Sequence, residues 1–314
     1  MTNRMPWWKK LIPSIVVIWA VTLVTFLLSR LLPGDPVIAL LGENATPELI
    51  ALWRDRFGLD EPLYTRYFQW LGRIFIGDFG YSYHTEEKVL DMILYRLPVT
   101  LEILVVTQIL ALAIALPLAI TSAWRNNKLF DKIAMAGSLS FLSMPPFLVG
   151  ILLIYFFSIQ LGWFPATGFT PVSEGIGKNL ASVFLPSLAL ALAEFPIYMR
   201  LLRADLIQTL QQDFITVARA KGISTKRILW RHALKPSSFS LLTVVGVNIG
   251  RLIGGTIIIE VLFAIPGIGQ LLIQSIYQQD FLVLQGIVLL VAVGFVVVNI
   301  FIDRLYIWLD PRAH

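Results

Sequence analysis

Side chains able to do covalent or metal chemistry are scarce in this sequence. The chain has no cysteine, and its three histidines, His84, His232 and His314, lie far apart. These counts exclude thiol nucleophiles, Cys-ligated zinc and iron–sulfur clusters, and they give no spacing typical of a metal site. No Gly-x4-Gly-Lys-Ser/Thr loop and no His-Glu-x-x-His helix occurs. We therefore expect a chain that is not an enzyme and that holds no metal or cofactor of its own.

One segment has the residue types expected of a docking helix. Residues 213–223 combine small side chains with basic ones and contain a glycine at 222, and a second short helix is expected at 225–234, at a new angle. Small side chains allow a helix to approach another protein closely, and a glycine often ends a helix. The alternative is an ordinary solvated basic loop. The candidate docking residues are Ala218, Arg219, Ala220, Lys221 and Gly222.

A second candidate is Arg251, which lies within an apolar run. An ionisable residue at membrane depth usually faces protein or water instead of lipid. Arg251 could line a pathway and attract a carboxylate, form a structural pair, or extend towards the membrane surface. Glu194, in the preceding apolar run, has no evident partner in the sequence.

The elements that carry these residues are predicted to be membrane-spanning helices. Hydrophobic residues make up 57% of the 314 residues and charged ones 14%, with a mean hydropathy of +0.75, whereas soluble domains contain about 25% charged residues. A span needs about 20 apolar residues. Six such runs predict an all-α integral membrane protein with six transmembrane helices, at residues 11–32, 99–123, 133–161, 180–198, 239–263 and 281–302. Prolines in the third and fourth runs are expected to be tolerated as kinks.

Basic residues between the runs predict the orientation. The first run is long and no small-x-small cleavage site follows it, so we expect an uncleaved span. Placing the N-terminus inside puts the basic residues of 125–132 and 200–235 in the cytoplasm, as the positive-inside rule requires. Both termini are then cytoplasmic. We expect residues 1–97 to form the first transmembrane helix plus a small extracytoplasmic cap, with helical stretches at 47–57 and 63–76, and 98–314 to form the core of five helices with a loop at about 199–236.

Several motifs carry a family resemblance. The Ala218–Gly222 segment, followed by a helix that ends His232-Ala233-Leu234, resembles the coupling loop of binding-protein-dependent ABC importer permeases of the dipeptide/oligopeptide/nickel branch. Thr216-Val217-Ala218 replaces the family's Glu-Ala-Ala, and the proline is displaced to Pro236. The similarity continues in order along nearly the whole chain, at residues 30–36, 58–63, 77–82, 260–269 and 309–312.

This resemblance implies a type I ABC importer permease fold and a set of partners. A second homologous permease subunit would complete the pathway, two cytosolic ATPase subunits holding ATP and Mg would dock on the coupling loop, and an extracytoplasmic binding protein would deliver substrate. The location implied is the bacterial plasma (inner) membrane, in the lipid bilayer, with no nucleic acid partner. Glu260, Phe263, Pro266 and Gly267 would help to gate the outer mouth, although Glu260 could equally anchor the membrane edge.

The cargo implied is a di- or oligopeptide, with nickel or a nickel–chelator complex as the alternative in the same machine. Two other classes fit the sequence less well. An intramembrane enzyme needs paired polar residues at matching depth, which we do not find in the sequence. A secondary transporter is expected to show two related halves with interrupted helices.

Overall fold

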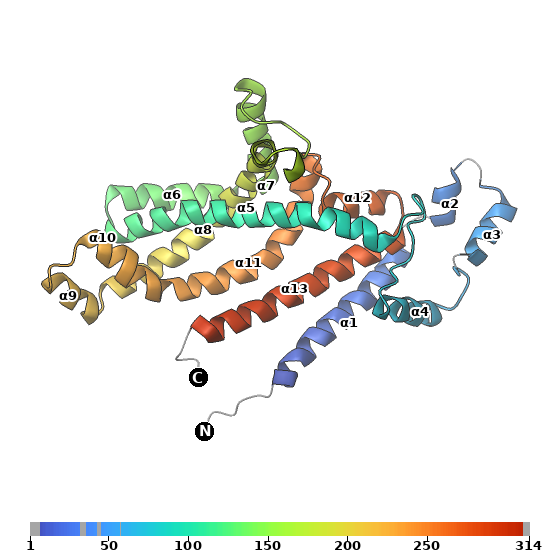
Figure 1. Ribbon diagram of the computed structural model, residues 1–314, viewed down its shortest axis with the longest axis horizontal. Helices are drawn as coiled ribbons and strands as arrows, with labels where there is room; N and C mark the ends of the chain where they lie inside the picture. Colours follow the sequence, from blue (N-terminus) through green and yellow to red (C-terminus); the bar gives the residue numbers. More distant parts are fainter. Residues whose placement is uncertain (1–6, 32–35, 43–44, 57, 310–314) are drawn as a thin grey trace. The chain divides into compact units, whose positions relative to one another are not determined.

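The computed structural model describes residues 7–31, 36–42, 45–56 and 58–309, and its regular elements are almost all helical (Figure 1). The predicted motifs at 30–36 and 309–312, and His314, lie wholly or partly outside the described residues. The helices are α1 (Trp7–Leu31), α2 (Pro36–Leu41), α3 (Pro47–Arg56), α4 (Leu63–Phe75), α5 (Val89–Trp124), α6 (Leu129–Ser143), α7 (Pro146–Leu153), η2 (Ile154–Gln160), η3 (Val172–Glu174), α8 (Ile176–Leu210), α9 (Asp213–Ala220), α10 (Thr225–Arg227), η4 (Ile228–Ala233), α11 (Leu234–Leu262), α12 (Ile268–Tyr277) and α13 (Phe281–Leu309).

The first of two compact units comprises residues 1–98 and 267–297. The start of α5 packs on α12 and α13 through a cluster that includes Val89, Ile93, Leu271 and Ile287. At Gly286 a Cβ would lie 2.8 Å from a methyl carbon of Val89, so the close approach of these helices requires glycine there. The expected helical stretches at 47–57 and 63–76 are confirmed as α3 and α4.

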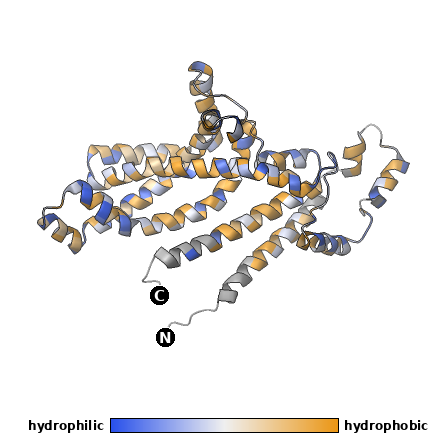
Figure 2. Ribbon diagram, in the orientation of Figure 1, coloured by the Kyte–Doolittle hydropathy of each residue, from blue (hydrophilic) through white to orange (hydrophobic). Residues whose placement is uncertain are grey.

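The second unit comprises residues 99–266 and 298–314, and α8 lies at its centre. α8 contacts α6, α7 and α11. Much of α8 is buried, including Pro186 and Pro196, which both lie inside the helix. Figure 2 shows hydrophobic residues along much of α5, α8 and α11 and hydrophilic ones gathered at α9 and α10.

The predicted spans recur in the described part of the chain with two differences. Four helices are long and apolar enough to cross a membrane: residues 89–124, 176–210, 225–262 and 281–300. The third predicted run is a fifth candidate only as a pair of helices, 129–143 and 146–160, bent by 101°. The helix breaks at Pro145 and Pro146, because a proline disfavours the helical conformation at the residue before it and lacks an N–H donor. Within the described residues the first run gives only a shorter apolar stretch, 15–27, of α1.

The loop between the fourth and fifth runs is also different from the expectation. The short helix expected at 225–234 is not a separate element: α10, η4 and α11 form one helix over residues 225–262. Helix α12 was not expected, because its ten residues are too short to span and lie directly beyond the proline-glycine turn. Its apolar residues Ile268 and Leu271 are nevertheless buried.

Candidate functional site

Helix α9 carries the predicted docking residues and presents a larger apolar face than expected. Ile215 and Ala218 are buried in a cluster with α5 and α8, so Ala218 faces its own chain. Phe214 is 48% exposed and Val217 51% exposed. The surface open to a partner therefore contains bulky apolar side chains, flanked by Ala220 and Lys221, and is not a purely small-residue face.

Gly222 ends α9 in the left-handed conformation. Its φ is +72°, and nothing in the described chain lies within 4 Å of where a Cβ would sit. The N–H of Ile223 donates to the carbonyl of Ala218 at 3.2 Å, and that of Gly222 donates to Arg219 at 2.9 Å. This is the Schellman pattern that favours glycine. The glycine is needed for backbone conformation, because no neighbour crowds it.

Arg219 links α9 to the C-terminal end of α5. Its guanidinium lies 5.6 Å from the centroid of the Trp124 ring, within cation–π range. Ala119 and Ala123, five residues and one residue before Trp124, belong to the same buried cluster as Ile215 and Ala218. The C-terminal part of α9 therefore contacts the end of α5 through this ring and shares a buried cluster with it.

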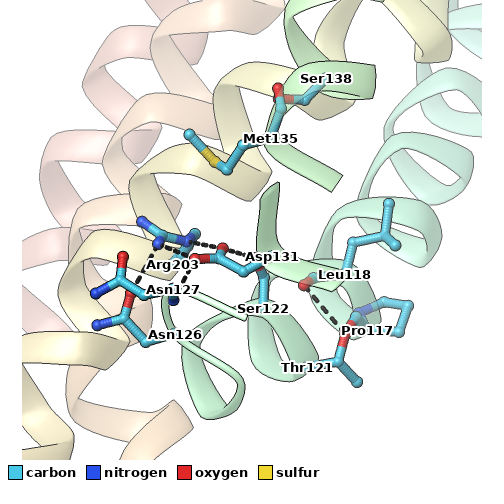
Figure 3. A network of polar contacts seen from close by, with 10 residues as sticks. All are labelled: Pro117, Leu118, Thr121, Ser122, Asn126, Asn127, Asp131, Met135, Ser138 and Arg203. Carbon is cyan, nitrogen blue, oxygen red and sulfur yellow. Dashed lines mark hydrogen bonds and ion pairs between the residues drawn. The ribbon is translucent and has the colours of Figure 1, made fainter. Parts of the chain in front are cut away.

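A buried ion pair fixes the turn between α5 and α6 to α8 (Figure 3). Arg203 donates from Nε and Nη2 to the two carboxylate oxygens of Asp131, each at 2.6 Å. Asp131 also accepts hydrogen bonds from the Ser122 hydroxyl and, at 2.9 Å, from the N–H of Asn127. Arg203 Nη2 donates to Asn126 at 3.0 Å. Both oxygens and the fork of the arginine are thus engaged, as a buried bidentate pair requires.

A second charged pair joins two predicted spans, from the centre of 239–263 and from near the inner end of 180–198. Arg251 Nη2 donates to Glu194 Oε1 at 2.7 Å, and Asn248 Nδ2 donates to Glu194 Oε2 at 3.0 Å. The Glu194 side chain is 6% exposed and that of Arg251 is 57% exposed. Of the alternatives for Arg251, the structural pair is therefore present, with much of the guanidinium still accessible.

This pair lines a cleft of about 220 Å³ in the second unit. Its other walls are apolar, and three of them, Leu142, Met144 and Pro146, come from the bend between α6 and α7. Backbone outside regular helix occurs at membrane depth only where it is covered by protein or lines a water-filled cavity. The bend and the charged pair therefore share one polar opening in an otherwise apolar region.

The predicted gate residues form a tight turn at the end of α11. Glu260 is fully buried and accepts a hydrogen bond from the Thr100 hydroxyl at 2.7 Å. Phe263 is 1% exposed, its carbonyl accepts from the N–H of Gly168 at 2.8 Å, and its ring lies 3.2 Å from where a Cβ of Gly150 would be. Pro266 is half-buried and Gly267 precedes α12.

Asp280 forms a further buried polar site that the sequence analysis missed. It precedes α13 and accepts from the Ser82 hydroxyl at 2.5 Å and from the N–H of Tyr83 at 3.1 Å. His84 Nε2 contacts the carbonyl of Gln278 at 2.6 Å. Burial raises the pKa of the Asp280 carboxyl, while its hydrogen bond from Ser82 acts in the opposite direction.

Sequence reasoning found Arg251 and Glu194 separately but did not join them. The available signal was that few ionisable residues lie inside apolar runs, which favours pairing among them. Nothing in the sequence indicated the Asp131–Arg203 pair, because both residues lie close to the ends of predicted apolar runs, where charged residues are common.

Comparisons with known proteins point to one family along almost the whole length of the chain. A family model described as "Binding-protein-dependent transport system inner membrane component" matches residues 115–314, and its N-terminal companion matches residues 7–104. The chain is 37% identical to a putative peptide transport system permease protein of Brucella suis, over 98% of both chains. It is 33% identical to the dipeptide permease DppB of Alkalihalophilus pseudofirmus, over 97% of both chains, and 33% identical to the glutathione permease GsiC of Escherichia coli K12, over 96% of both.

Among solved structures, an inward-facing MetNI methionine ABC transporter matches with a TM-score of 0.58, at 17% identity, over 70% of this chain and 96% of that one. This likeness shows a type I importer permease-like fold. The family match over more than half of the chain, with the relatives above, identifies the chain as a member of the family of inner-membrane components of binding-protein-dependent transport systems.

Proposed function

We propose that this chain is one of two permease subunits of an ATP-driven importer and forms half of its pathway for di- or oligopeptides. The observation that carries this proposal is full-length similarity to relatives named for peptide, dipeptide and glutathione transport. Those names favour peptide cargo over the nickel alternative. The proposed arrangement has six spans, both termini in the cytoplasm, a cap within residues 1–97 and a core at 98–314.

Helix α9 is the proposed contact with a cytosolic ATPase subunit, which would hold the ATP and Mg. The exposed Phe214 and Val217 supply apolar area, and Arg219, Ala220, Lys221 and Gly222 border it. The buried side of α9, with Ala218, would carry the ATPase movement to η4, which α9 contacts, and through the shared buried cluster to α5 and α8. Such a rigid connection suits a switch between two packed states.

The turn after α11 is the proposed gate on the extracytoplasmic side. Glu260 and Phe263 are buried and tied to α5 and to the loop at Gly168, so the turn moves with the elements that hold it. Pro266 and Gly267 end the turn and begin α12. An extracytoplasmic binding protein would deliver cargo on this side.

Uptake by the complete transporter in proteoliposomes tests the function. We expect ATP-dependent accumulation of labelled di- or tripeptide when binding protein, both permease subunits and both ATPase subunits are present. Leaving out this chain is expected to abolish it. Accumulation of a nickel–chelator complex without peptide uptake would instead support the alternative cargo, and ATP-independent uptake would contradict the proposal.

A further inference from the structure

Three features meet at the 220 Å³ cleft between α6, α7, α8 and α11, which we name the Arg251 cleft after its exposed cation. They are the bent α6–α7 pair, the buried carboxylate of Glu194 and the exposed guanidinium of Arg251. Exposing any of these three features to lipid would cost free energy. A charged side chain at the centre of a bilayer is unfavourable, and backbone outside regular helix must be covered by protein or line a water-filled cavity.

Depth makes this argument stronger. Arg251 is eleven residues from Leu262, where its helix ends, and lies at the centre of the predicted run 239–263. At a rise of about 1.5 Å per residue, Arg251 is roughly 16 Å from the end of its helix. A guanidinium at that depth cannot reach a membrane surface easily. The exposed side of Arg251 therefore faces water or another protein.

The hydrogen bonds decide which charge this cleft can receive. Both carboxylate oxygens of Glu194 are occupied, one by Asn248 and one by Arg251, and its side chain is buried. Glu194 is therefore poorly placed to take an ammonium group. Arg251 uses Nη2 for Glu194, and in the described part of the chain no hydrogen bond involves its Nε or Nη1. Its remaining donors suit a carboxylate, which guanidinium binds in a forked geometry.

Size limits what part of a cargo fits. Ligand pockets for whole small molecules measure about 300–1,000 Å³. The cleft has space for one end of a peptide and not for the peptide as a whole. Its apolar walls, which include Leu142, Met144 and Leu252, would accept the last side chain while Arg251 binds the terminal group.

We propose that Arg251, oriented by Glu194 and Asn248, binds the carboxylate of the cargo as it passes the α6–α7 bend. This inference rests on the proposed peptide transport and names the chemical group that the pathway recognises. Glu194 is a positioning residue: it holds Arg251 and offsets its charge, so that the empty site carries no net charge.

The test compares cargo with and without the carboxylate. Uptake of Ala-Ala-Ala and of its C-terminal amide is measured in proteoliposomes with the complete transporter, before and after Arg251→Gln. Selection by the binding protein is the same in both transporters and cancels in the variant-to-wild-type ratio. We expect Ala-Ala-Ala uptake to fall roughly tenfold or more, because a hydrogen bond to a charged group contributes about 1.5–3 kcal/mol, and uptake of the amide to change less than twofold.

Two variants guard against a purely structural loss. Arg251→Gln leaves Glu194 buried and unpaired, which destabilises a protein. The double variant Glu194→Gln with Arg251→Gln removes both charges together, with an isosteric replacement at 194, and the same selective loss is expected. Lys178→Gln, an exposed charge at the start of α8, is the matched control and is expected to leave both uptakes unchanged.

The outcomes separate the two proposals. If the wild type transports neither peptide, the proposed function fails. If it transports both but the double variant loses both equally, or neither, the carboxylate site is wrong while the function stands. Uptake of Ala-Asp-Ala-amide distinguishes a side-chain carboxylate from the C-terminal one. If this uptake depends on Arg251, a side-chain carboxylate is also accepted. If it does not, recognition is restricted to the C-terminal carboxylate.

Discussion

The contribution of the Asp131–Arg203 pair to the stability of this membrane protein can be measured with a single substitution. The Asp131→Asn substitution removes the negative charge to which Nε and Nη2 of Arg203 donate. It leaves the Arg203 side chain, which is only 17% exposed, without its opposite charge. We expect a loss of about 3 kcal/mol, the typical cost of breaking a buried pair. Thermal unfolding of the purified transporter in detergent measures it.

A double variant provides the control for that pair. Asp131→Leu with Arg203→Met removes both charges together, and apolar replacements of buried pairs are often neutral. We expect it to be more stable than Asp131→Asn. An Asp131→Asn protein that unfolds at the wild-type temperature would contradict the importance given to the network in Figure 3.

Asp280 gives a pH dependence with a defined sign. Its pKa is raised in the folded protein, so between its unfolded and folded pKa values the folded state binds more protons. Its contribution to stability therefore decreases as pH rises through that range. We expect hydrogen exchange of residues 80–88, corrected for its intrinsic pH dependence, to show less protection at pH 7 than at pH 4.5. Asp280→Asn should reduce this difference, and an unchanged difference would assign it to other groups.

At the scale of elements, Gly222 tests whether α9 must keep its termination. Asparagine tolerates positive φ and a β-branched residue does not. Gly222→Asn should therefore retain coupling, whereas Gly222→Val should cost about 1–2 kcal/mol locally and allow ATP hydrolysis without peptide uptake. The measurement is the ratio of peptide transported to ATP hydrolysed. Normal coupling in Gly222→Val would contradict a coupling role for this helix.

The elements also show what a sequence can and cannot predict. Runs such as 99–123 and 180–198 have a length and composition that only a membrane helix explains, and α5 and α8 contain them. Pro145 and Pro146 indicated a kink, but the 101° bend depends on what α7 packs against, and Gly150 allows that close contact with Leu262 and Phe263. The orientation of Ala218 towards its own chain is likewise decided by tertiary packing, which periodicity over eight residues does not determine.

The same limit applies to the candidate site. Arg251 stood out because a charge in an apolar run is unusual. Its partner lies 57 residues away in the chain, on α8. Nothing in the local spacing joins the two, since the register between α8 and α11 follows from their packing. The scarcity of charged residues in apolar runs thus identified Arg251 and Glu194 separately. Only the fold shows that they form a pair.

At the scale of the whole molecule, the proposed topology can be tested residue by residue, because the chain contains no cysteine. Single cysteines are introduced at the exposed positions Glu61, Lys128, Glu174 and Lys221. In right-side-out membrane vesicles we expect a membrane-impermeant maleimide to label Glu61→Cys and Glu174→Cys directly. Lys128→Cys and Lys221→Cys should react only after permeabilisation.

Each neighbouring pair of positions isolates one crossing. Residues 61 and 128 flank α5, and 174 and 221 flank α8, so opposite labelling within each pair shows that these helices span. Residues 128 and 174 flank the bent α6–α7 pair, for which two geometries are possible. Opposite labelling makes the pair one broken span and agrees with cytoplasmic termini and six spans. Labelling on the same side would make the α6–α7 pair a re-entrant loop. The number of apolar runs in the sequence would then exceed the number of membrane crossings by one.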